Sequence, residues 1–376
     1  MKIKFAYRLH TKSTLFSFDD LIEEVPINGI SLKKRQDDAF LKHGIKIIDI
    51  LSKEEISEKN SFLFDNNLFF TPEFVKSAIN NIVDISTPLR FCLKTNTFNQ
   101  HFILPSNEKY TNKLAFNFYF NVKGSTQYKD CTLSQVVYKY NIHLPKELAA
   151  DPVFHFDQCD TFITIILSPF HLLQSNLAML THRNVSYIKK IPNWILKKMA
   201  PVHSPLFYMG LRLQNKIGNK CRIHKTAVIE GATIGDNVTI GAYAVVRMSS
   251  IGDNTTLEDH ATVHYSVLGE NNYIAAHNHA AHCMTYNDVF LIHGPYQFSI
   301  FGRNCNIFAT INCDIRLDKK HILIPTEYGL INSGLSFLGI AYGHNCKIGA
   351  GTIIAPGRIV PNGKHINPPA ATITSF

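Results

Sequence analysis

The chain has 376 residues, of which 45% are hydrophobic and 18% are charged, and this balance excludes an intrinsically disordered protein. Its formal net charge of +9 favours an acidic partner, such as a phosphorylated small molecule. Nucleic acid is disfavoured as that partner, because the sequence has no basic run interleaved with aromatic residues and no zinc-finger spacing. The length is sufficient for two domains with separate cores.

Two features predict a cytoplasmic protein without an integral membrane segment. No apolar run reaches the ~18 residues that a transmembrane helix needs, and the sequence starts without an apolar core of signal-peptide length. The eight cysteines include no C-x-x-C pair, which is typical of reduced thiols rather than of disulfides.

The first domain is predicted over residues 1–200, where strand-like and helix-like segments alternate. The segment TPEFVKSAIN has helical spacing. Runs rich in β-branched and aromatic residues predict strands, and these runs are KIKFAY, GIKIIDI, SFLFDN, RFCLKT, KLAFNFYFNV and TFITIIL. This mixture favours an α/β layer fold.

Pieces of the first half resemble sugar-phosphate nucleotidyltransferases. VPINGISLKKRQDDAFLKHGIKIIDI is similar to the segment in which their substrate loop leads into a helix and the second strand. LFDNNLFF resembles the strand that carries their metal-binding aspartate, and this match falls on Asp65. LSPFHLLQSNLAML resembles their W-D-L-L-E-A-N helix, with Leu173 and Asn176 at matching positions.

The glycine-rich loop of those enzymes is missing from this sequence. Glycine is needed there because its lack of a side chain lets backbone N–H groups approach the nucleotide phosphates closely. The first glycine of the chain is Gly29, and no G-x-x-x-x-G-K-[ST] motif occurs elsewhere. The sequence therefore predicts a degenerate nucleotidyltransferase-like domain that does not transfer nucleotides.

A basic and aromatic linker is predicted over residues 181–216. It contains Trp194, the single tryptophan of the chain, and paired lysines. Such a segment either lies on a membrane surface or packs one domain on the other, and we favour the second interpretation.

The second domain, residues 219–376, contains a repeat of 17 residues. The units IGDNVTIGAYAVVRMSS, IGDNTTLEDHATVHYSV and LGENNYIAAHNHAAHCM begin at Ile234, Ile251 and Leu268, and an apolar residue returns every six positions within each unit. This spacing fits a coil of three short strands and three corners. Gly, Asn and Asp recur at the corners, where a left-handed backbone is required. The repeat therefore predicts a parallel β-helix.

Residues 219–366 resemble the left-handed β-helix of the hexapeptide acyltransferases, and IGAGTIIAPG is the most specific motif. That family is typically trimeric, so the resemblance implies a homotrimer. The two halves together are similar to the bifunctional glucosamine-1-phosphate acetyltransferase/uridylyltransferase family. In that family a stretch matched here by AAHNHA carries the catalytic histidine, which falls on His277. The sequence departs from the family by an extra unit at residues 285–300.

Residues 316–339 interrupt the repeat and are predicted to project from the coil. Similar loops line the active site of the next subunit in the hexapeptide acyltransferases, so the resemblance implies a role of this insertion in function.

Histidines are concentrated in the β-helix, where six of the 18 fall between residues 260 and 293. The 17-residue register stacks His277 directly above His260 and brings His264 close to His282, at about the 5 Å spacing of neighbouring strands. Such a cluster has three interpretations, which are acyl transfer, metal chemistry and a non-catalytic role.

In the first interpretation, which the resemblance supports, His277 is the general base. It removes a proton from a substrate amine or hydroxyl as this group attacks an acyl thioester such as acetyl-CoA. His277 and His279 are expected to lie on one strand and, being two residues apart, to point the same way and face the same cleft. The acceptor is then a sugar phosphate, a nucleotide sugar or a related small molecule.

In the second interpretation the histidines bind zinc. LEDHATVH and HNHAAH resemble γ-class carbonic anhydrases, with Glu258, Asp259 and His264 matching one element and His277 and His282 the other. Three neutral histidines leave a position on zinc open for water. In the third interpretation the histidines form a polar ladder on a non-catalytic, sugar-nucleotide-binding scaffold.

Overall fold

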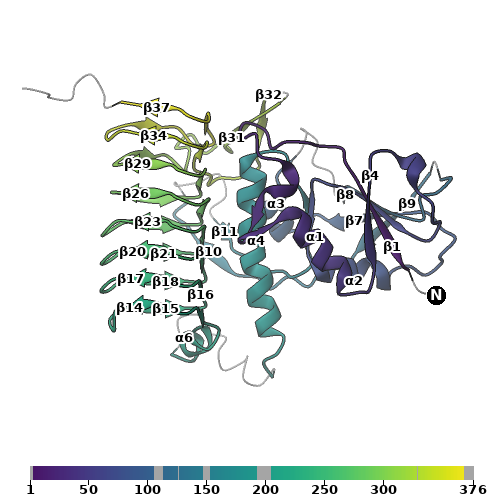
Figure 1. Cartoon of the computed structure of the whole chain (residues 1–376), viewed down its shortest axis with the longest axis horizontal. Coiled ribbons are helices and arrows are strands. Elements are labelled where there is room, and N and C mark those ends of the chain that lie inside the picture. The colour runs from purple at the N-terminus through teal and green to yellow at the C-terminus, as the bar shows by residue number, and fades with distance from the viewer. Residues whose placement is uncertain are drawn as a thin grey trace, which may run out of the picture. The chain divides into compact units, whose positions relative to one another are not determined.

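We analysed the chain in a computed structural model, shown in Figure 1. The chain divides into two compact units, residues 1–143 with 153–182 and residues 144–152 with 183–376. The structure describes residues 3–105, 113–125, 127–146, 153–192, 205–327 and 329–367. Residues 193–204 of the predicted linker, including Trp194, therefore lie outside the described residues.

The N-terminal unit is an α/β domain built on a mixed six-stranded sheet. Strand β1 pairs in parallel with β4 and β5, whereas β8 runs antiparallel to both β5 and β7. In spatial order the strands are β4 (Lys46–Ile50), β1 (Phe5–Leu9), β5 (Phe62–Asp65), β8 (Lys113–Phe120), β7 (Leu89–Lys94) and β9 (Lys129–Leu133).

In the described part of the unit, four helices and three short strand pairs accompany this sheet. The helices are α1 (Leu32–Leu41), α2 (Pro72–Asn80), α3 (Thr97–Phe102) and α4 (Pro169–Ile188), with 3₁₀ turns η1 (Ile22–Glu24) and η2 (Lys53–Glu55). The pairs are β2 (Pro26–Ile27) with β3 (Ile30–Ser31), β12 (Ile163–Ile165) with β6 (Leu68–Phe70), and β10 (Asn141–His143) with β11 (Val153–His155). Ser31 and Thr71 cap the N-termini of α1 and α2 through their hydroxyl groups.

Phenylalanine rings form the core between the sheet and helix α1. Phe40 of α1 stacks on Phe64 and Phe118, with ring centroids 5.4 and 6.0 Å apart. Phe118 also meets Phe70 and Phe74 edge to face. All five rings are buried, so the alternating apolar residues of these strands and helices supply one continuous hydrophobic layer.

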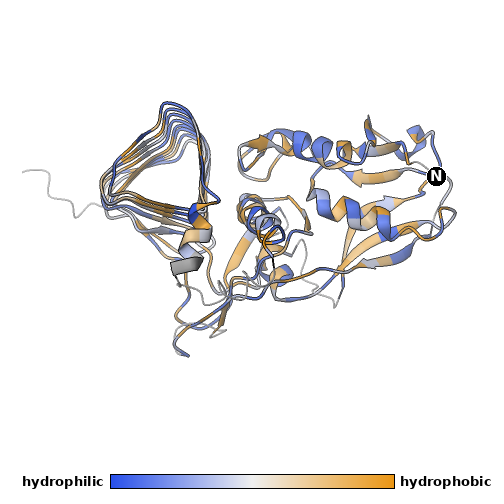
Figure 2. Cartoon of the chain, turned by 90° about the horizontal axis from the view of Figure 1, so that it is seen from below, coloured by the Kyte–Doolittle hydropathy of each residue, from blue (hydrophilic) through white to orange (hydrophobic). Residues whose placement is uncertain are grey.

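The C-terminal unit is a left-handed parallel β-helix of stacked triangular coils, which Figure 2 shows in projection. Its first sheet contains β13 (Lys216–Ile217), β16 (Thr233–Ile234), β19 (Ser250–Ile251), β22 (Val267–Leu268), β25 (Met284–Thr285), β28 (Ile300–Phe301), β33 (Ala341–Tyr342) and β36 (Ile359–Val360). The second sheet contains β14 (Arg222–Ile223), β17 (Thr239–Ile240), β20 (Thr256–Leu257), β23 (Tyr273–Ile274), β26 (Phe290–Ile292), β29 (Asn306–Phe308), β34 (Lys347–Ile348) and β37 (His365–Ile366). The third sheet contains β15 (Val228–Glu230), β18 (Val245–Arg247), β21 (Thr262–His264), β24 (His279–Ala281) and β27 (Tyr296–Gln297).

The 17-residue repeat is the distance from one strand to its parallel neighbour in the next coil. Ile234 pairs with Ile251, which pairs with Leu268, and all three side chains are buried inside the coil. Asn237 and Asn254 turn the corner after their strands with left-handed φ angles of 55° and 57°. Inward apolar residues and left-handed corners therefore account for the repeat seen in the sequence.

The predicted insertion at residues 316–339 contains a hairpin of β31 (Leu323–Thr326) and β32 (Gly329–Asn332). Ile322 and Ile324 at its base are fully buried. A short parallel pair, β30 (Ile311–Asn312) and β35 (Ile353–Ile354), joins the chain before the insertion to the chain after it, and helix α6 (Pro205–Arg212) precedes the first coil.

The structure confirms the predicted fold class and the predicted secondary structure of the first half. The six strand-like runs coincide with β1, β4, β5, β7, β8 and β12, and TPEFVKSAIN coincides with α2. Strands β9, β10 and β11 and helix α3 were not predicted, because their sequences carry few consecutive apolar residues. Within the described part of the chain, every helix is too short or too polar to cross a lipid bilayer.

Substitution of a core position tests the coil stacking. Leu257→Ala should lower the free energy of unfolding by about 2–5 kcal/mol, because it leaves a cavity at a fully buried position. The neighbouring change Thr256→Ala removes atoms from the half-buried outer face of the same strand and should cost about 0.5 kcal/mol. Urea unfolding followed by circular dichroism measures both, and equal effects would contradict the inward orientation of Leu257.

Candidate functional site

Aromatic rings form a column on the outer corner between the second and third sheets. The imidazoles of His260 and His277 are 4.7 Å apart and nearly parallel, with an interplanar angle of 6°. The ring of Tyr243 lies 5.1 Å below His260 at 15°. All three residues are exposed and have left-handed φ angles between 57° and 60°. The predicted stacking of His277 above His260 is confirmed.

The backbone of this corner is held by a carboxylate and a backbone carbonyl of the coil below. Glu258 accepts a hydrogen bond from the backbone N–H of Ala276 at 3.2 Å and a short one from the hydroxyl of Tyr273. The N–H of His277 donates to the carbonyl of Asp259 at 3.1 Å. Hydrogen bonds to the coil below therefore hold the corner at His277 and at the residue before it.

His264 and His279 form a separate pair on the outer face of the third sheet. They lie on adjacent strands, β21 and β24, and both are partly buried. Burial lowers the pKa of His279. Burial, with the charges of Arg247 and His279, lowers the pKa of His264 to about 4, so its imidazole is neutral at pH 7.

His282 belongs to a third group, at the corner that follows the third sheet. Its ring stacks on Phe298 at 4.6 Å and 10°, and Tyr265 lies 5.7 Å away on the other side. Phe298 in turn lies 5.8 Å from Phe337, which comes from the insertion. His264 is 6.2 Å from His282 in a tilted arrangement, close to the near-stacking that the repeat predicted.

Within one copy of the chain, the alternative zinc ligands are not brought together. His277 precedes strand β24 and His282 follows it, so the two side chains leave the coil at opposite ends of one strand. His264 lies with His282 and not with His277. Among the residues that the structure describes, no group of three His, Cys, Asp or Glu side chains could hold a metal ion.

The position of His277 differs in one respect from its sequence interpretation. The sequence suggested that His277 and His279 point the same way from one strand. The structure assigns His279 to β24 but His277 to the corner before it, with a left-handed backbone. Sequence analysis also missed Arg247, whose guanidinium donates to Glu230 at 2.7 Å beside His264. An ion pair across neighbouring strands could have been found from the 17-residue spacing of these two residues.

In the N-terminal unit, the side chain of Asn66 forms hydrogen bonds with the backbone of the loop that follows β1. The backbone N–H groups of Thr11 and Lys12, which follow β1, both donate to the side-chain oxygen of Asn66 at 3.1 Å. The amide of Asn66 donates in return to the carbonyl of Lys12 at 2.7 Å. Asn66 thus binds N–H groups at the place where a glycine-rich loop would offer them to phosphate.

The other nucleotidyltransferase-like positions also have internal partners. Burial raises the pKa of Asp65, and its carboxylate accepts a hydrogen bond from Asn117 at 2.7 Å. Asn176 accepts from the N–H of Asn28 at 2.6 Å and donates to the carbonyl of Pro26 at 2.9 Å. Leu173 is a core residue.

Comparison with known proteins agrees with the β-helix. Residues 213–323 match the family model of the GMPPB C-terminal domain. The predicted resemblance of the repeats to left-handed hexapeptide β-helices is confirmed for this part of the chain. No curated protein matches the sequence.

Three solved structures are similar to parts of the chain. An inositol-1-phosphate CTP transferase from T. maritima has 12% identity and a TM-score of 0.26, covering 35% of this chain and 78% of that one. An acetyltransferase from Bacillus cereus has 18% identity and a TM-score of 0.22, covering 41% and 76%. A UDP-N-acetylglucosamine acyltransferase from Campylobacter jejuni has 18% identity and a TM-score of 0.20, covering 39% and 58%. At these values the likenesses do not extend to activity.

The lowered pKa of His264 predicts a pH-dependent stability. The unfolded chain takes up the proton near pH 6.5, whereas the folded chain takes it up only near pH 4. Stability is therefore fully present above pH 6.5 and falls by roughly 3 kcal/mol as the pH drops to 4. His264→Gln should remove this contribution, so the difference in unfolding free energy between variant and parent should change between pH 7 and 4. Parallel profiles would contradict the burial of a neutral imidazole.

Proposed function

We propose that the chain transfers an acyl group from a thioester such as acetyl-CoA to an amine or hydroxyl group, with His277 as the general base. The observation that supports this most is the exposed imidazole of His277 at a fixed corner of a hexapeptide-type β-helix. Its ring packs face to face on His260, which limits its rotation and orients its nitrogens. A base must be held in one orientation to accept a proton from a bound acceptor.

The proposed reaction has two bond changes at the thioester carbon. The acceptor nitrogen or oxygen attacks the carbonyl carbon and passes its proton to a ring nitrogen of His277. The C–S bond then breaks, and the leaving thiolate takes up the proton. The products are the acylated acceptor and the free thiol, and the imidazole is regenerated neutral.

Neighbouring residues have proposed supporting roles. His279 follows His277 by two residues and, because burial lowers its pKa, favours the neutral form that can accept a hydrogen bond from the acceptor. Phe337 of the insertion packs on Phe298, at the corner after the third sheet and not at the corner of His277, so we propose that residues 316–339 line the site of a neighbouring subunit. We propose a homotrimer, in which a second copy covers the exposed corner of His277 and excludes water from it.

The acceptor is proposed to be a phosphorylated small molecule, such as a sugar phosphate or a nucleotide sugar. The net charge of +9 supports an anionic substrate. Thioester consumption measured over a panel of amino sugars, sugar phosphates and nucleotide sugars would identify it.

A non-catalytic, sugar-nucleotide-binding scaffold is the second candidate function. It is favoured by the N-terminal unit, where Asn66 and Asn176 satisfy the backbone groups of two nucleotidyltransferase-like segments. If no acceptor of the panel consumes thioester but one of them binds, this second function is supported instead.

Replacement of His277 tests the proposed base. His277→Asn should reduce turnover by about 10² to 10⁴, because an amide cannot take up the proton at neutral pH. Asparagine tolerates the left-handed φ of 59°, so the corner should keep its conformation. Affinity for the acyl thioester should change little.

His293→Asn is the matched control for this test. His293 is also exposed and left-handed, at the equivalent corner one coil further on. It should keep the parent turnover, and an equal loss in both variants would contradict a specific role of His277.

Zinc content separates acyl transfer from the alternative metal chemistry. Under the proposal, the purified protein should retain full turnover after dialysis against a chelator, and zinc measured by mass spectrometry should not track activity. If zinc is instead required, His264→Ala, His277→Ala and His282→Ala should each release the metal and abolish activity together.

A further inference from the structure

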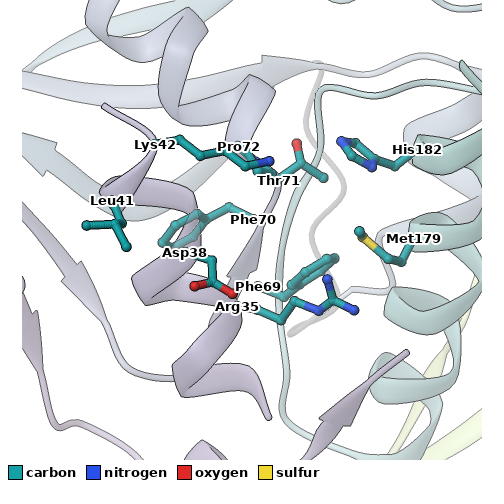
Figure 3. A pocket seen from close by; sticks show the side chains of 10 residues that line it. All are labelled: Arg35, Asp38, Leu41, Lys42, Phe69, Phe70, Thr71, Pro72, Met179 and His182. Carbon is teal, nitrogen blue, oxygen red and sulfur yellow. The ribbon is translucent and has the colours of Figure 1, made fainter. Parts of the chain in front are cut away.

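A pocket of about 330 Å³ lies in the N-terminal unit, lined by residues from the three segments that resemble nucleotidyltransferases. It is bounded by the second half of α1, strand β6, the start of α2 and the second half of α4. Figure 3 shows the side chains of Arg35 and Lys42 directed toward Met179 and His182 of α4. Neither Asp65 nor Asn176 lines this pocket.

Arg35 carries a positive charge that forms no ion pair with a carboxylate of the described residues, although the charge of Asp38 acts on it. Its Nε donates to the carbonyl of Ile27 at 2.9 Å and its Nη2 to the carbonyl of Asn28 at 3.1 Å. Within the described parts of the chain, no carboxylate lies within 4.0 Å of this guanidinium. Burial lowers the pKa of Arg35, and the charge of Asp38 opposes this shift only in part. The two carbonyls fix the guanidinium in place but leave its charge uncompensated.

Lys42 adds a second cation on the other side of the pocket. It directly follows α1 and is exposed, and its ammonium forms no ion pair with any described residue. The acid that lines the pocket, Asp38, is already paired with Lys34 at 2.7 Å. The charge that remains for a ligand is therefore positive.

His182, which also lines the pocket, is in contact with the carboxylate of Glu73 through its Nε2. Burial alone would raise the pKa of Glu73, but the hydrogen bond and charge of His182 outweigh it and keep that pKa below its usual range. The charge of Lys42 also contributes to this lowering of the Glu73 pKa, but Glu73 does not line the pocket and is not within ion-pair distance of Lys42.

Apart from Thr71, the remaining residues of the pocket wall are apolar. They are Leu41, which is 68% exposed, Pro72, Met179 and the buried Phe69 and Phe70. An apolar wall with two fixed cations suits a ligand that has an apolar body and an anionic head.

We propose that this pocket binds a small organic anion, with a carboxylate or phosphate head between Arg35 and Lys42 and its apolar body against Leu41 and Met179. Arg35 offers its remaining N–H groups from a fixed position, and Lys42 reaches the head from the solvent side. This site is independent of the acyl transfer proposed for the β-helix.

Calorimetric titration of the full chain with four six-carbon probes tests the proposed ligand chemistry. Hexanoate and monohexyl phosphate should bind, hexanol should bind at least about tenfold more weakly, and hexylammonium should not bind. The stronger of the two anions identifies the preferred head group. Hexanol that binds as tightly as the anions, or no binding of either anion, would overturn the proposal.

Charge reversal locates the binding site. Lys42→Glu should weaken binding of the better anion by about tenfold or more, and folding should be unaffected because Lys42 is exposed. Lys76→Glu is the matched control, since Lys76 is exposed on α2 and does not line the pocket. Met179→Trp should block binding by filling the pocket without a change of charge. Equal weakening by Lys42→Glu and Lys76→Glu would overturn the assignment to this pocket.

Discussion

The C-terminal unit depends on one constraint, which is that every coil must bring its inward side chains directly above those of the coil below. Parallel pairing of Ile234, Ile251 and Leu268 satisfies this constraint only if the chain turns sharply at three corners in 17 residues. Those turns need a left-handed backbone, and left-handed residues project outward. The geometry that closes the core therefore also displays His260 and His277 as a stacked pair at the surface.

This constraint explains which parts of the site were predictable. The register of 17 residues follows from the apolar repeat alone, so the stacking of His277 on His260 could be derived before any coordinates. The division of each coil into two-residue and three-residue sides is not visible in the sequence, because corner and strand positions share small residues such as alanine. For that reason His277 was assigned to a strand, although it occupies the corner before β24.

The N-terminal unit shows a different limit of sequence analysis. Its strands were predicted because apolar runs such as SFLFDN and KLAFNFYFNV must be buried, and the missing glycines predicted the loss of a phosphate-binding loop. The side chain that accepts hydrogen bonds from this loop could not be predicted. Asn66 is more than fifty positions from Thr11 and Lys12, and it reaches their N–H groups only because β5 pairs with β1. A short sequence motif does not predict a hydrogen bond between residues so far apart in the chain.

Two regions of the N-terminal unit differ in how their polar groups are paired. In the loop after β1 the N–H groups of Thr11 and Lys12 have an internal acceptor, so binding of a phosphate there would have to break hydrogen bonds that Asn66 already makes. Arg35 has instead kept two neutral carbonyls as partners, and a guanidinium in that environment retains an unscreened charge. Burial of such a charge destabilises the folded chain unless a counterion approaches it. A bound counterion would therefore remove a destabilising contribution from Arg35, which is the physical reason for the anion site that we propose beside α1.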